Sequence, residues 1–425
     1  MQQALFGATD PFEDRKTLDV TFKGKLNLPI HRWYRLTPSF SPRLALDIAN
    51  HFNLGPRDYV LDPFSGVGTV PLCMKYEGIP VCSIELNPYL YFVSTIKTRT
   101  YNDLPRIARC FDDFVDLARR ETDGLRNIRR ARPYLISNAE FIPPIHNPDR
   151  WWSPTNLAQL VAIRKLILGF NETDEHINLL RMGILGILVQ VSNAKHNHVS
   201  LTFAAKPLAT VNVVDHLREK LDEIAEDLEA VRHRPSAQVT VYAGNSRTVD
   251  RVLPVSPKVS AVITSPPYPN RFSYARETRP HLFFFDFIKD AKSVGEMEIE
   301  AIGGTWGKAT SVLMNGVEPA NKLVEELLAP FTARVNGDGR LMANYVVKYF
   351  NNIFEHAEGI SKVCRQHAKL AYVIGNSKFF DHPLPSDEIL AGIFGYFGFA
   401  LDGISKMRRR QSKRGLYESV VFMSR

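Results

Sequence analysis

The sequence predicts an α/β fold in which a mostly parallel sheet is interrupted, along the chain, by a helical insertion. Short strands alternate with a helix over residues 58–85, strands return from residue 238 onward, and the segment between them carries helical patterns. Strand–helix–strand units build parallel sheets. We therefore expect one α/β domain formed by residues 1–100 and 238–425, with residues 101–237 as a helical insertion.

The first unit is marked by its strands and by a glycine. Asp58–Asp62 reads as a short strand with an apolar centre, and a glycine turn leads from it into a helical run, Thr69–Glu77. Gly78 is suited to end that helix. Val81–Glu85 is the next strand, so this part of the chain predicts a βαβ unit.

The insertion is predicted to be helical from the spacing of its apolar residues. Residues 178–190 read as a buried helix, and a second, amphipathic helix ends before Pro235. Its apolar positions recur at spacings of three and four: Leu217, Leu221, Ile224, Leu228 and Val231. From residue 238 onward, runs of β-forming residues predict five strands, at Gln238–Ala243, Val259–Thr264, Arg340–Val347, Leu370–Ile374 and Leu416–Met423.

Composition limits the class of protein. The chain is 44% hydrophobic and 23% charged, as in globular enzymes, and its net charge of +8 suits a polyanionic partner. No run of about 18 apolar residues is present, so we expect no membrane span. The four cysteines have no paired spacing, and the N-terminus lacks a secretory signal pattern. We expect neither disulfides nor a metal, and a cytoplasmic location.

A glycine-rich turn follows the first predicted strand. Its sequence, Asp62-Pro-Phe-Ser-Gly66-Val-Gly68-Thr69, leads into a helix N-terminus, and the glycines let a ligand approach the backbone closely. Glu85 ends the second strand, where an acid can accept both hydroxyls of a ribose. The turn lacks the Gly-x-Gly-x-x-Gly spacing of pyrophosphate sites, and Asp62 would repel a phosphate but attract an ammonium. S-adenosylmethionine has a ribose and an ammonium but no phosphate.

A second motif, Thr264-Ser265-Pro266-Pro267-Tyr268, comes directly after an apolar strand. The prolines lack N–H donors, so their carbonyls stay free to accept hydrogen bonds. An exocyclic amine could give its hydrogens to the Ser265 hydroxyl and to a proline carbonyl, which would turn its lone pair toward a methyl donor. Tyr268 offers an aromatic face for a base drawn out of a duplex.

With these two motifs the sequence resembles the amino-methyltransferases of DNA. The cofactor motif of that family is Asp-Pro-Phe-x-Gly-x-Gly-Thr, and its catalytic motif is Asp/Ser/Asn-Pro-Pro-Tyr/Phe. The Ser-Pro-Pro-Tyr form in this chain is similar to that of cytosine-N4 enzymes, whereas Asp-Pro-Pro-Tyr is more common in adenine-N6 enzymes. The cofactor motif comes first here, which excludes the permuted class with the catalytic motif first.

Further segments extend the resemblance over most of the chain outside the insertion. His31–Pro42, which includes Ser41, resembles the segment that closes over the methionine end of the cofactor. Tyr242–Arg247 resembles the segment that contacts adenine, with Asn245 where Asp is usual. Two segments near the C-terminus resemble the sixth and seventh strands of the fold: Gly375–Lys378 and Tyr417–Val421.

The resemblance implies the Rossmann-like, seven-stranded, mostly parallel sheet of class I methyltransferases and S-adenosylmethionine as cofactor. The α/β domain would be the catalytic methyltransferase domain, and the insertion a target-recognition or cap region. The implied cofactor-binding residues are Asp62, Phe64, Gly66, Gly68, Thr69, Glu85, Asn245 and Ser41. The implied catalytic residues are Ser265, Pro266, Pro267 and Tyr268.

Two groups of basic residues are candidates for DNA contacts. One lies near the Ser265–Tyr268 turn, called the catalytic turn below, and the other lies before the last predicted strand. Arg271 and Arg276 alternate with aromatic residues just after the turn. The densest basic cluster begins with Arg408, Arg409 and Arg410 and continues to Arg414, and we expect it in a loop that contacts phosphates. The implied partners are double-stranded DNA and a cognate restriction endonuclease, in a nucleoid-associated setting in a bacterium or archaeon.

The motifs leave four alternative functions to consider, of which three stay open. Cytosine-C5 methylation needs a cysteine nucleophile, normally within Pro-Cys-Gln, and no cysteine here has that setting, so it is excluded. Adenine-N6 methylation needs the same lone-pair geometry as cytosine-N4 methylation. RNA guanine-N2 enzymes carry a similar turn, although no appended RNA-binding module is evident. A non-catalytic DNA-binding subunit should have lost Gly66, Gly68, Glu85 or the Pro-Pro-Tyr turn, all of which are present.

Overall fold

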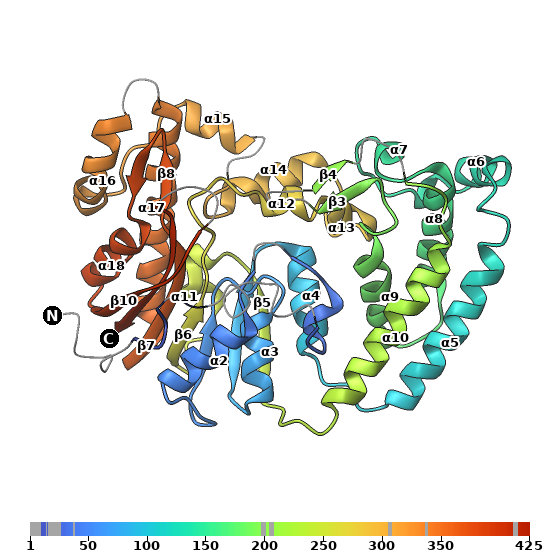
Figure 1. The fold of residues 1–425 in the computed structure, drawn as a ribbon, viewed down its shortest axis with the longest axis horizontal. Coiled ribbons are helices and arrows are strands. Elements are labelled where there is room, and N and C mark those ends of the chain that lie inside the picture. Colours follow the sequence, from blue (N-terminus) through green and yellow to red (C-terminus); the bar gives the residue numbers. More distant parts are fainter. Residues whose placement is uncertain are drawn as a thin grey trace.

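The structure is a computed structural model, and it describes residues 10–13, 15, 27–36, 39–196, 201–203, 208–304, 308–335, 339–410 and 415–425. Two groups of elements lie toward opposite ends of the molecule (Figure 1). The large sheet lies toward one end, and the long helices of the insertion lie at the other. Helices α12 (Tyr274–Glu277), α13 (Arg279–Phe284) and α14 (Ala291–Glu300) lie between them.

Seven strands form one sheet in the order β10-β11-β7-β6-β1-β2-β5. Every neighbouring pair is parallel except those made by β11, which runs antiparallel to both β7 and β10. This order and this one reversed strand are the arrangement of class I methyltransferases, as the sequence predicted. The strands are β1 (Val60–Asp62), β2 (Val81–Glu85), β5 (Val239–Ala243), β6 (Val259–Thr264), β7 (Cys364–Gly375), β10 (Ala400–Arg409) and β11 (Tyr417–Ser424).

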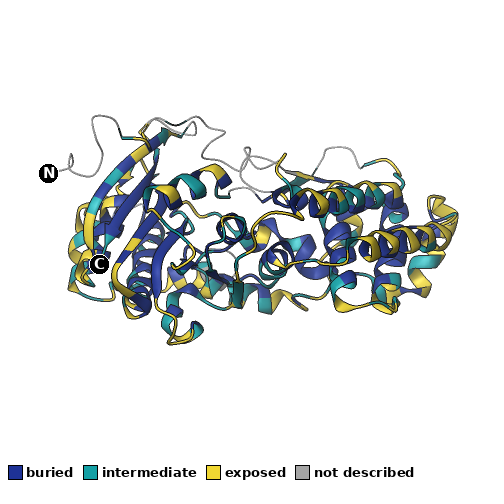
Figure 2. Cartoon of the chain, turned by 90° about the horizontal axis from the view of Figure 1, so that it is seen from below, coloured by how far each residue is buried: buried dark blue, intermediate teal, exposed yellow. Residues whose placement is uncertain are grey.

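The central strands are buried on both faces. Because successive side chains point to opposite faces, Val60 packs with α2 (Pro42–His51) and α3 (Thr69–Tyr76), whereas Leu61 packs with helices of the C-terminal half. The helices of that half are α11 (Val249–Val252), α15 (Lys308–Met314), α16 (Lys322–Val335), α17 (Arg340–Val363) and α18 (Ser386–Tyr396). The buried residues run from the sheet into the helical end of the molecule (Figure 2).

Residues 101–237 contain most of the remaining helices and a small hairpin. The hairpin pairs β3 (Ala194–His196) with β4 (Leu201–Phe203), and a second hairpin outside the insertion pairs β8 (Ser377–Phe379) with β9 (His382–Leu384). Helix α4 (Pro88–Thr98) leads from β2 into this region. The helices are α5 (Leu104–Glu121), α6 (Ile128–Ser137), α7 (Pro148–Trp151), α8 (Pro154–Gly169), α9 (Asp174–Ile187) and α10 (Val213–Val231). No described helix is both long and apolar enough to cross a membrane.

One buried carboxylate joins the insertion to the N-terminal segment. Asp227 of α10 accepts hydrogen bonds from the Ile30 backbone N–H (2.7 Å) and the Trp33 indole N–H (2.9 Å), and it pairs with Arg32 (2.7 Å). Asp227 and Trp33 are both buried. The hydrophobic core of the insertion includes Trp33 and Leu36, so these two parts of the chain share one core.

Three local predictions are wrong. Residues 340–347 were predicted as a strand but begin helix α17, because their buried residues recur at helical spacing: Met342, Tyr345, Val346 and Tyr349. Arg408 and Arg409 were expected in a loop but end strand β10. Gly375–Lys378 was expected to belong to the sixth strand of the fold, but it covers the end of β7 and the start of β8. The sixth strand is β10. Residues 411–414 of the basic cluster lie outside the described part of the chain.

Candidate active site

One cavity lies at the carboxyl ends of the central parallel strands. The chain leaves β1 toward β2 on one side, whereas β6 lies on its other side, so the cavity lies at a topological switch point, where ligands of such sheets bind. Both sequence motifs line it. Its lining includes Asp62–Val67 and Thr69 after β1, Ile84–Asn87 at the end of β2, Asn245 and Ser246 after β5, and Ser265–Tyr268 after β6.

The glycine turn is held by Glu85. Gly66 has a left-handed φ of 53°, and its N–H donates to Glu85 Oε2 at 2.7 Å. The Asn87 N–H donates to Glu85 Oε1 at 2.8 Å. Burial raises the pKa of Glu85 to about 7, although these two backbone hydrogen bonds oppose the rise. The carboxylate therefore holds the turn, and Glu85 also lines the cavity.

Gly68 and Lys97 support the turn from the side of α4. Gly68 has φ of 74°, and a Cβ there would lie 2.7 Å from Ser94 Oγ and 3.1 Å from Ser94 Cα, so glycine lets α4 pack closely. Gly68 itself does not line the cavity. The buried Lys97 Nζ donates to the Val67 carbonyl at 2.9 Å, and burial lowers the pKa of Lys97 to about 7.

Asp62 links the two motifs. Its Oδ1 accepts hydrogen bonds from the Phe64 N–H (3.1 Å) and from the hydroxyl of Thr264 (2.6 Å), the last residue of β6. Burial raises the pKa of Asp62 to about 7, while both hydrogen bonds oppose the rise. Because Thr264 directly precedes Ser265, this bond fixes the cofactor turn and the catalytic turn relative to each other.

The Ser265–Tyr268 turn, predicted to be catalytic, has two candidate acceptors on residues that line the cavity. Ser265 Oγ donates its hydrogen to the Val373 carbonyl (3.0 Å), which leaves lone pairs on the oxygen, and the hydroxyl also interacts with that of Tyr268. The Tyr349 hydroxyl donates to the Pro267 carbonyl (2.7 Å) and occupies it. For the Pro266 carbonyl, no hydrogen-bond partner is seen within the described part of the chain. Of the two proline carbonyls, that of Pro266 therefore has both lone pairs available to a substrate.

The cavity fits a positively charged ligand with hydroxyl groups and no phosphate. Among its described lining residues, none is lysine or arginine, and four are acidic: Asp62, Glu85, Glu298 and Glu418. Ser39 Oγ and Thr69 Oγ1 also belong to the lining, and within the described residues both are buried without a hydrogen-bond partner. Buried hydroxyls without partners are uncommon in native proteins, so these two are placed to bind a polar ligand.

Of the other predicted cofactor residues, some line the cavity and one does not. Phe64 and Asn245 line the cavity, and Asn245 Oδ1 accepts the Arg247 N–H at 3.0 Å. Ser41 does not line it, because it is buried at the N-cap of α2. Ser39 and Phe40, from the same segment, line the cavity instead. Residues 37–38 lie outside the described part of the chain.

The predicted DNA-binding arginines lie outside the cavity lining. Arg271 and Arg276 are exposed beside the catalytic turn. Arg409 is exposed on β10, whereas Arg408 Nε pairs with Glu418 Oε2 at 2.6 Å. Arg410 Nη1 donates to the Asn376 carbonyl at 3.0 Å. Arg408 is thus held by a carboxylate in the structure.

Sequence reasoning missed several residues of the cavity. Glu298 lies in α14 and accepts the Ser273 hydroxyl at 2.6 Å, and Glu418 lies in β11 beside Tyr268. Tyr349 acts from α17 on the catalytic turn. No local motif marks these residues, because each reaches the site from an element distant in sequence.

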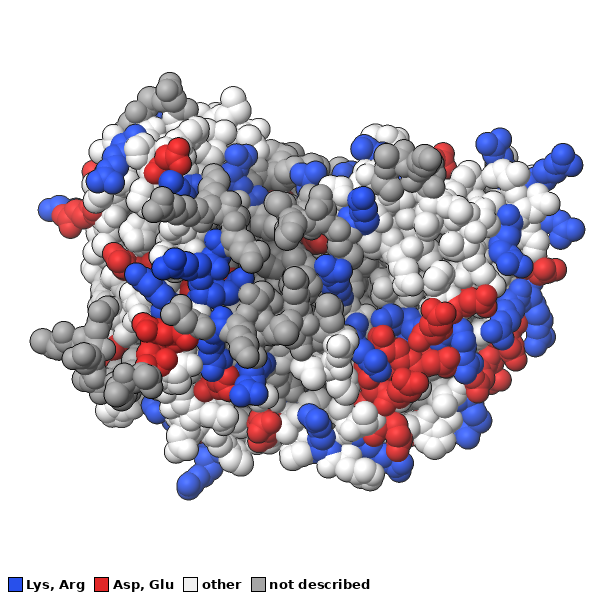
Figure 3. All heavy atoms as spheres, in the orientation of Figure 1, with Lys and Arg blue, Asp and Glu red and all other residues white. Residues whose placement is uncertain are grey.

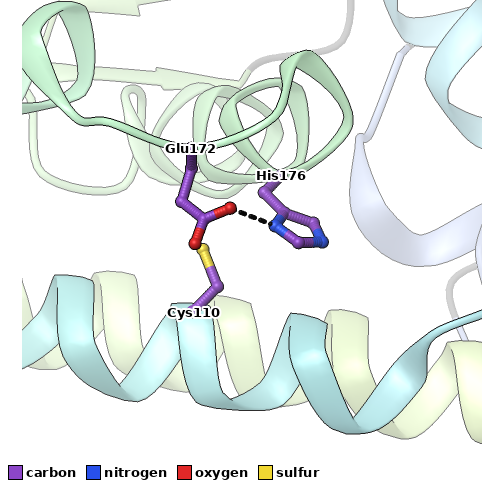
Figure 4. Close-up of side chains that lie close together, drawn as sticks. All are labelled: Cys110, Glu172 and His176. Carbon is purple, nitrogen blue, oxygen red and sulfur yellow. Dashed lines mark hydrogen bonds and ion pairs between the residues drawn. The ribbon is translucent and has the colours of Figure 1, made fainter.

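Within the described residues, one group of potential metal ligands lies in the insertion, outside the cavity lining (Figure 4). The ligand atoms of Cys110, Glu172 and His176 lie within 4.8 Å of one another. Glu172 Oε2 already bonds His176 Nδ1 (2.8 Å) and lies 3.4 Å from Arg106 Nη2. Burial raises the pKa of Cys110 to about 12, which keeps the thiol protonated. The group is accounted for as a hydrogen-bonded contact between α5 and α9.

Comparisons with known proteins found type II methyltransferases among the relatives of this chain. The chain is 23% identical to the type II methyltransferase M.BsoBI of Geobacillus stearothermophilus, over 92% of this chain and 83% of the relative. It is 20% identical to the type II methyltransferase M.AvaI of Nostoc sp., over 91% of this chain and 82% of that protein. No family model matches the chain. A solved rRNA methyltransferase, aviRa from Streptomyces viridochromogenes, aligns with a TM-score of 0.29 and 10% identity, too low to carry weight.

The fold is that of class I methyltransferases, and the methyl donor is S-adenosylmethionine. The particular proteins that this chain is similar to are type II methyltransferases, and the similarity extends over nearly the whole chain.

Proposed function

We propose that this protein is a DNA methyltransferase that transfers a methyl group from S-adenosylmethionine to the exocyclic N4 amine of cytosine in duplex DNA, within one short sequence. The observation that carries the proposal is that the glycine turn with Glu85 and the Ser265–Tyr268 turn line the same cavity. The methyl donor and the acceptor amine would then meet in one enclosed space. Such positioning supplies much of the rate of a two-substrate reaction.

The chain activates the amine by holding its hydrogens. Ser265 Oγ and the Pro266 carbonyl accept the two N–H groups, which turns the nitrogen lone pair toward the donor. Bound S-adenosylmethionine supplies a methyl group on a sulfonium. The new N–C bond forms as the S–C bond breaks with its electron pair left on sulfur, and the nitrogen then loses one proton to solvent. Tyr268 stacks on the extruded base, because a base within the duplex cannot reach the cavity.

The choice of cytosine rests on the Ser-Pro-Pro-Tyr form of the catalytic turn. An aspartate at position 265 would resemble the commoner adenine-N6 form, whereas Ser265 offers a neutral acceptor. Adenine N6 would satisfy the same two acceptors, so it is the alternative target. The intact cofactor turn and catalytic turn argue against a non-catalytic subunit.

Charge supports DNA as the polymer that is methylated. The chain carries a net charge of +8. In Figure 3, basic side chains gather in the middle of the part formed by the large sheet, whereas acidic ones gather over part of the insertion. Helix α10 lies in this part of the molecule (Figure 1), and its sequence includes Asp215, Glu219, Asp222, Glu223 and Glu226. We infer that DNA lies across the sheet side, and that the insertion acts as a target-recognition or cap region through its less acidic parts.

The relatives suggest the biological setting. Because the similar proteins are type II methyltransferases, we propose that this enzyme belongs to a restriction–modification system with a cognate endonuclease. Methylation of the recognised sequence would then protect the host DNA from that nuclease.

The test is incubation with unmethylated plasmid DNA and isotope-labelled S-adenosylmethionine, followed by nucleoside mass spectrometry. We expect labelled N4-methylcytosine in the wild-type reaction, and a much slower reaction with Ser265→Ala, whose cofactor affinity should stay the same. Labelled N6-methyladenine would overturn the cytosine assignment and keep the mechanism. An absence of labelled DNA, with transfer to RNA in a parallel reaction, would overturn the proposed substrate.

A further inference from the structure

Three residues form a row across the last strands of the sheet, next to the catalytic turn. Arg408 of β10 is paired with Glu418 of β11, and Glu418 is paired with Gly375 of β7. Residues paired across neighbouring strands lie side by side. The row therefore meets the cavity at Glu418, which belongs to the cavity lining.

Both oxygens of the Glu418 carboxylate are engaged. Arg408 Nε donates to Oε2 at 2.6 Å, and the Tyr268 hydroxyl donates to Oε1 at 3.0 Å. The side chains of Arg408 and Glu418 are only 21% and 11% exposed, so solvent screens this pair weakly. The arginine thus fixes the carboxylate, and the carboxylate fixes the end of the tyrosine ring.

The ring of Tyr268 is also held along its length. A Cβ at Gly375 would lie 2.9 Å from Tyr268 Cδ2, so the ring lies against backbone that has no side chain. The Arg410 guanidinium lies 5.7 Å from the ring centroid, and its Nη1 is tied to the Asn376 carbonyl. These contacts and the bond to Glu418 leave the ring little freedom to rotate.

We propose that Glu418 and Arg408 are positioning residues, which hold the Tyr268 ring in the orientation that the target base stacks on. The inference rests on the proposed function and adds to it two residues that do not touch the substrate. If the ring is already ordered before the base arrives, it loses no further conformational entropy when the base stacks on it. The whole free energy of stacking is then available for binding the base. Arg408 then acts through Glu418 and not by contacting a phosphate.

The test is a double-mutant cycle between Tyr268→Phe and Glu418→Leu, with kcat and KM for DNA measured at saturating S-adenosylmethionine. We expect each single change to lower kcat/KM for DNA about tenfold, as for the loss of a hydrogen bond to a charged group. The double variant should lose no more than either single variant, because both remove the same contact. Glu418→Gln should recover part of the loss, since its amide oxygen can still accept the tyrosine hydroxyl. Cofactor affinity should not change in any variant.

A control removes a more exposed ion pair, made by Arg365 at the start of β7. Arg365 Nη2 pairs with Asp58 Oδ1 at 2.9 Å, and Arg365→Met should leave both kinetic constants unchanged. If Glu418→Leu does not fold, Arg408→Met forms the cycle with Tyr268→Phe instead.

Additive losses, about a hundredfold in the double variant, would show that Glu418 acts elsewhere than on Tyr268 and would overturn the inference. Failure of the proposed function is seen separately, because the wild-type enzyme would then leave DNA unmethylated.

Discussion

Replacing Glu85 tests how the cofactor site is built. The Glu85 carboxylate accepts the N–H groups of Gly66 and Asn87 at 2.7 and 2.8 Å and lines the cavity. Glu85→Gln places an NH2 group against one of these donors, so one hydrogen bond to a charged acceptor is lost, at a cost of about 1.5–3 kcal/mol. We expect affinity for S-adenosylmethionine to fall at least about tenfold at pH 8. Glu85→Ala should lose more, because it removes both acceptors.

The pH dependence sharpens this test. Burial raises the pKa of Glu85 to about 7, so below that pH the wild-type carboxyl is protonated and resembles glutamine. The difference in affinity between wild type and Glu85→Gln should therefore shrink from pH 8 to pH 6, as measured by isothermal titration calorimetry. Glu175→Gln, which breaks a surface pair with Arg99, is the control and should bind as the wild type does. A folded Glu85→Ala variant with unchanged affinity would refute this reasoning.

Three further outcomes are expected. Burial raises the pKa values of Asp62 and Glu85 to about 7, and binding of the cationic cofactor should favour the ionised form of both. Calorimetry in buffers of different ionisation enthalpy should therefore detect protons released on binding near pH 7 and none near pH 9. Gly68→Ala should lower the free energy of unfolding by at least about 1–2 kcal/mol for its left-handed φ, whereas Gly55→Ala, with open space around it, should change it little in urea titrations. Arg409→Ala should reduce the salt dependence of DNA binding by a slope of about 0.9, and an unchanged slope would place Arg409 off the DNA.

Much of the fold was predictable because its signals are local. The strand before each motif, the glycine turn and the Ser-Pro-Pro-Tyr turn all lie within short runs of sequence. The order of parallel strands then follows from the βαβ units and from the family resemblance. That the two motifs meet at one cavity follows in turn, because the carboxyl ends of parallel strands share one edge of the sheet.

The failed predictions concern segments whose local pattern is ambiguous. Residues 340–347 contain β-branched and aromatic residues that favour a strand, but their burial follows the helical period of α17. Strand β10 carries Lys406, Arg408 and Arg409 because it is an edge strand, and charged side chains are usual on such an edge. Glu418 and Tyr349 could not be assigned to the site, because only tertiary packing brings them to the catalytic turn.

The bonds of Asp227 limit how this enzyme could be re-engineered. Its carboxylate holds Ile30 and Trp33 of the segment that continues to Leu36 and Phe40 in the cavity wall. A chimaera that exchanged the whole of residues 101–237, the proposed target-recognition or cap region, for a segment of another specificity would also remove this anchor. Methyl-donor binding would then fail together with sequence recognition. An exchange that keeps α10 in place, and replaces only helices before it, preserves the wall and allows the two properties to be varied separately.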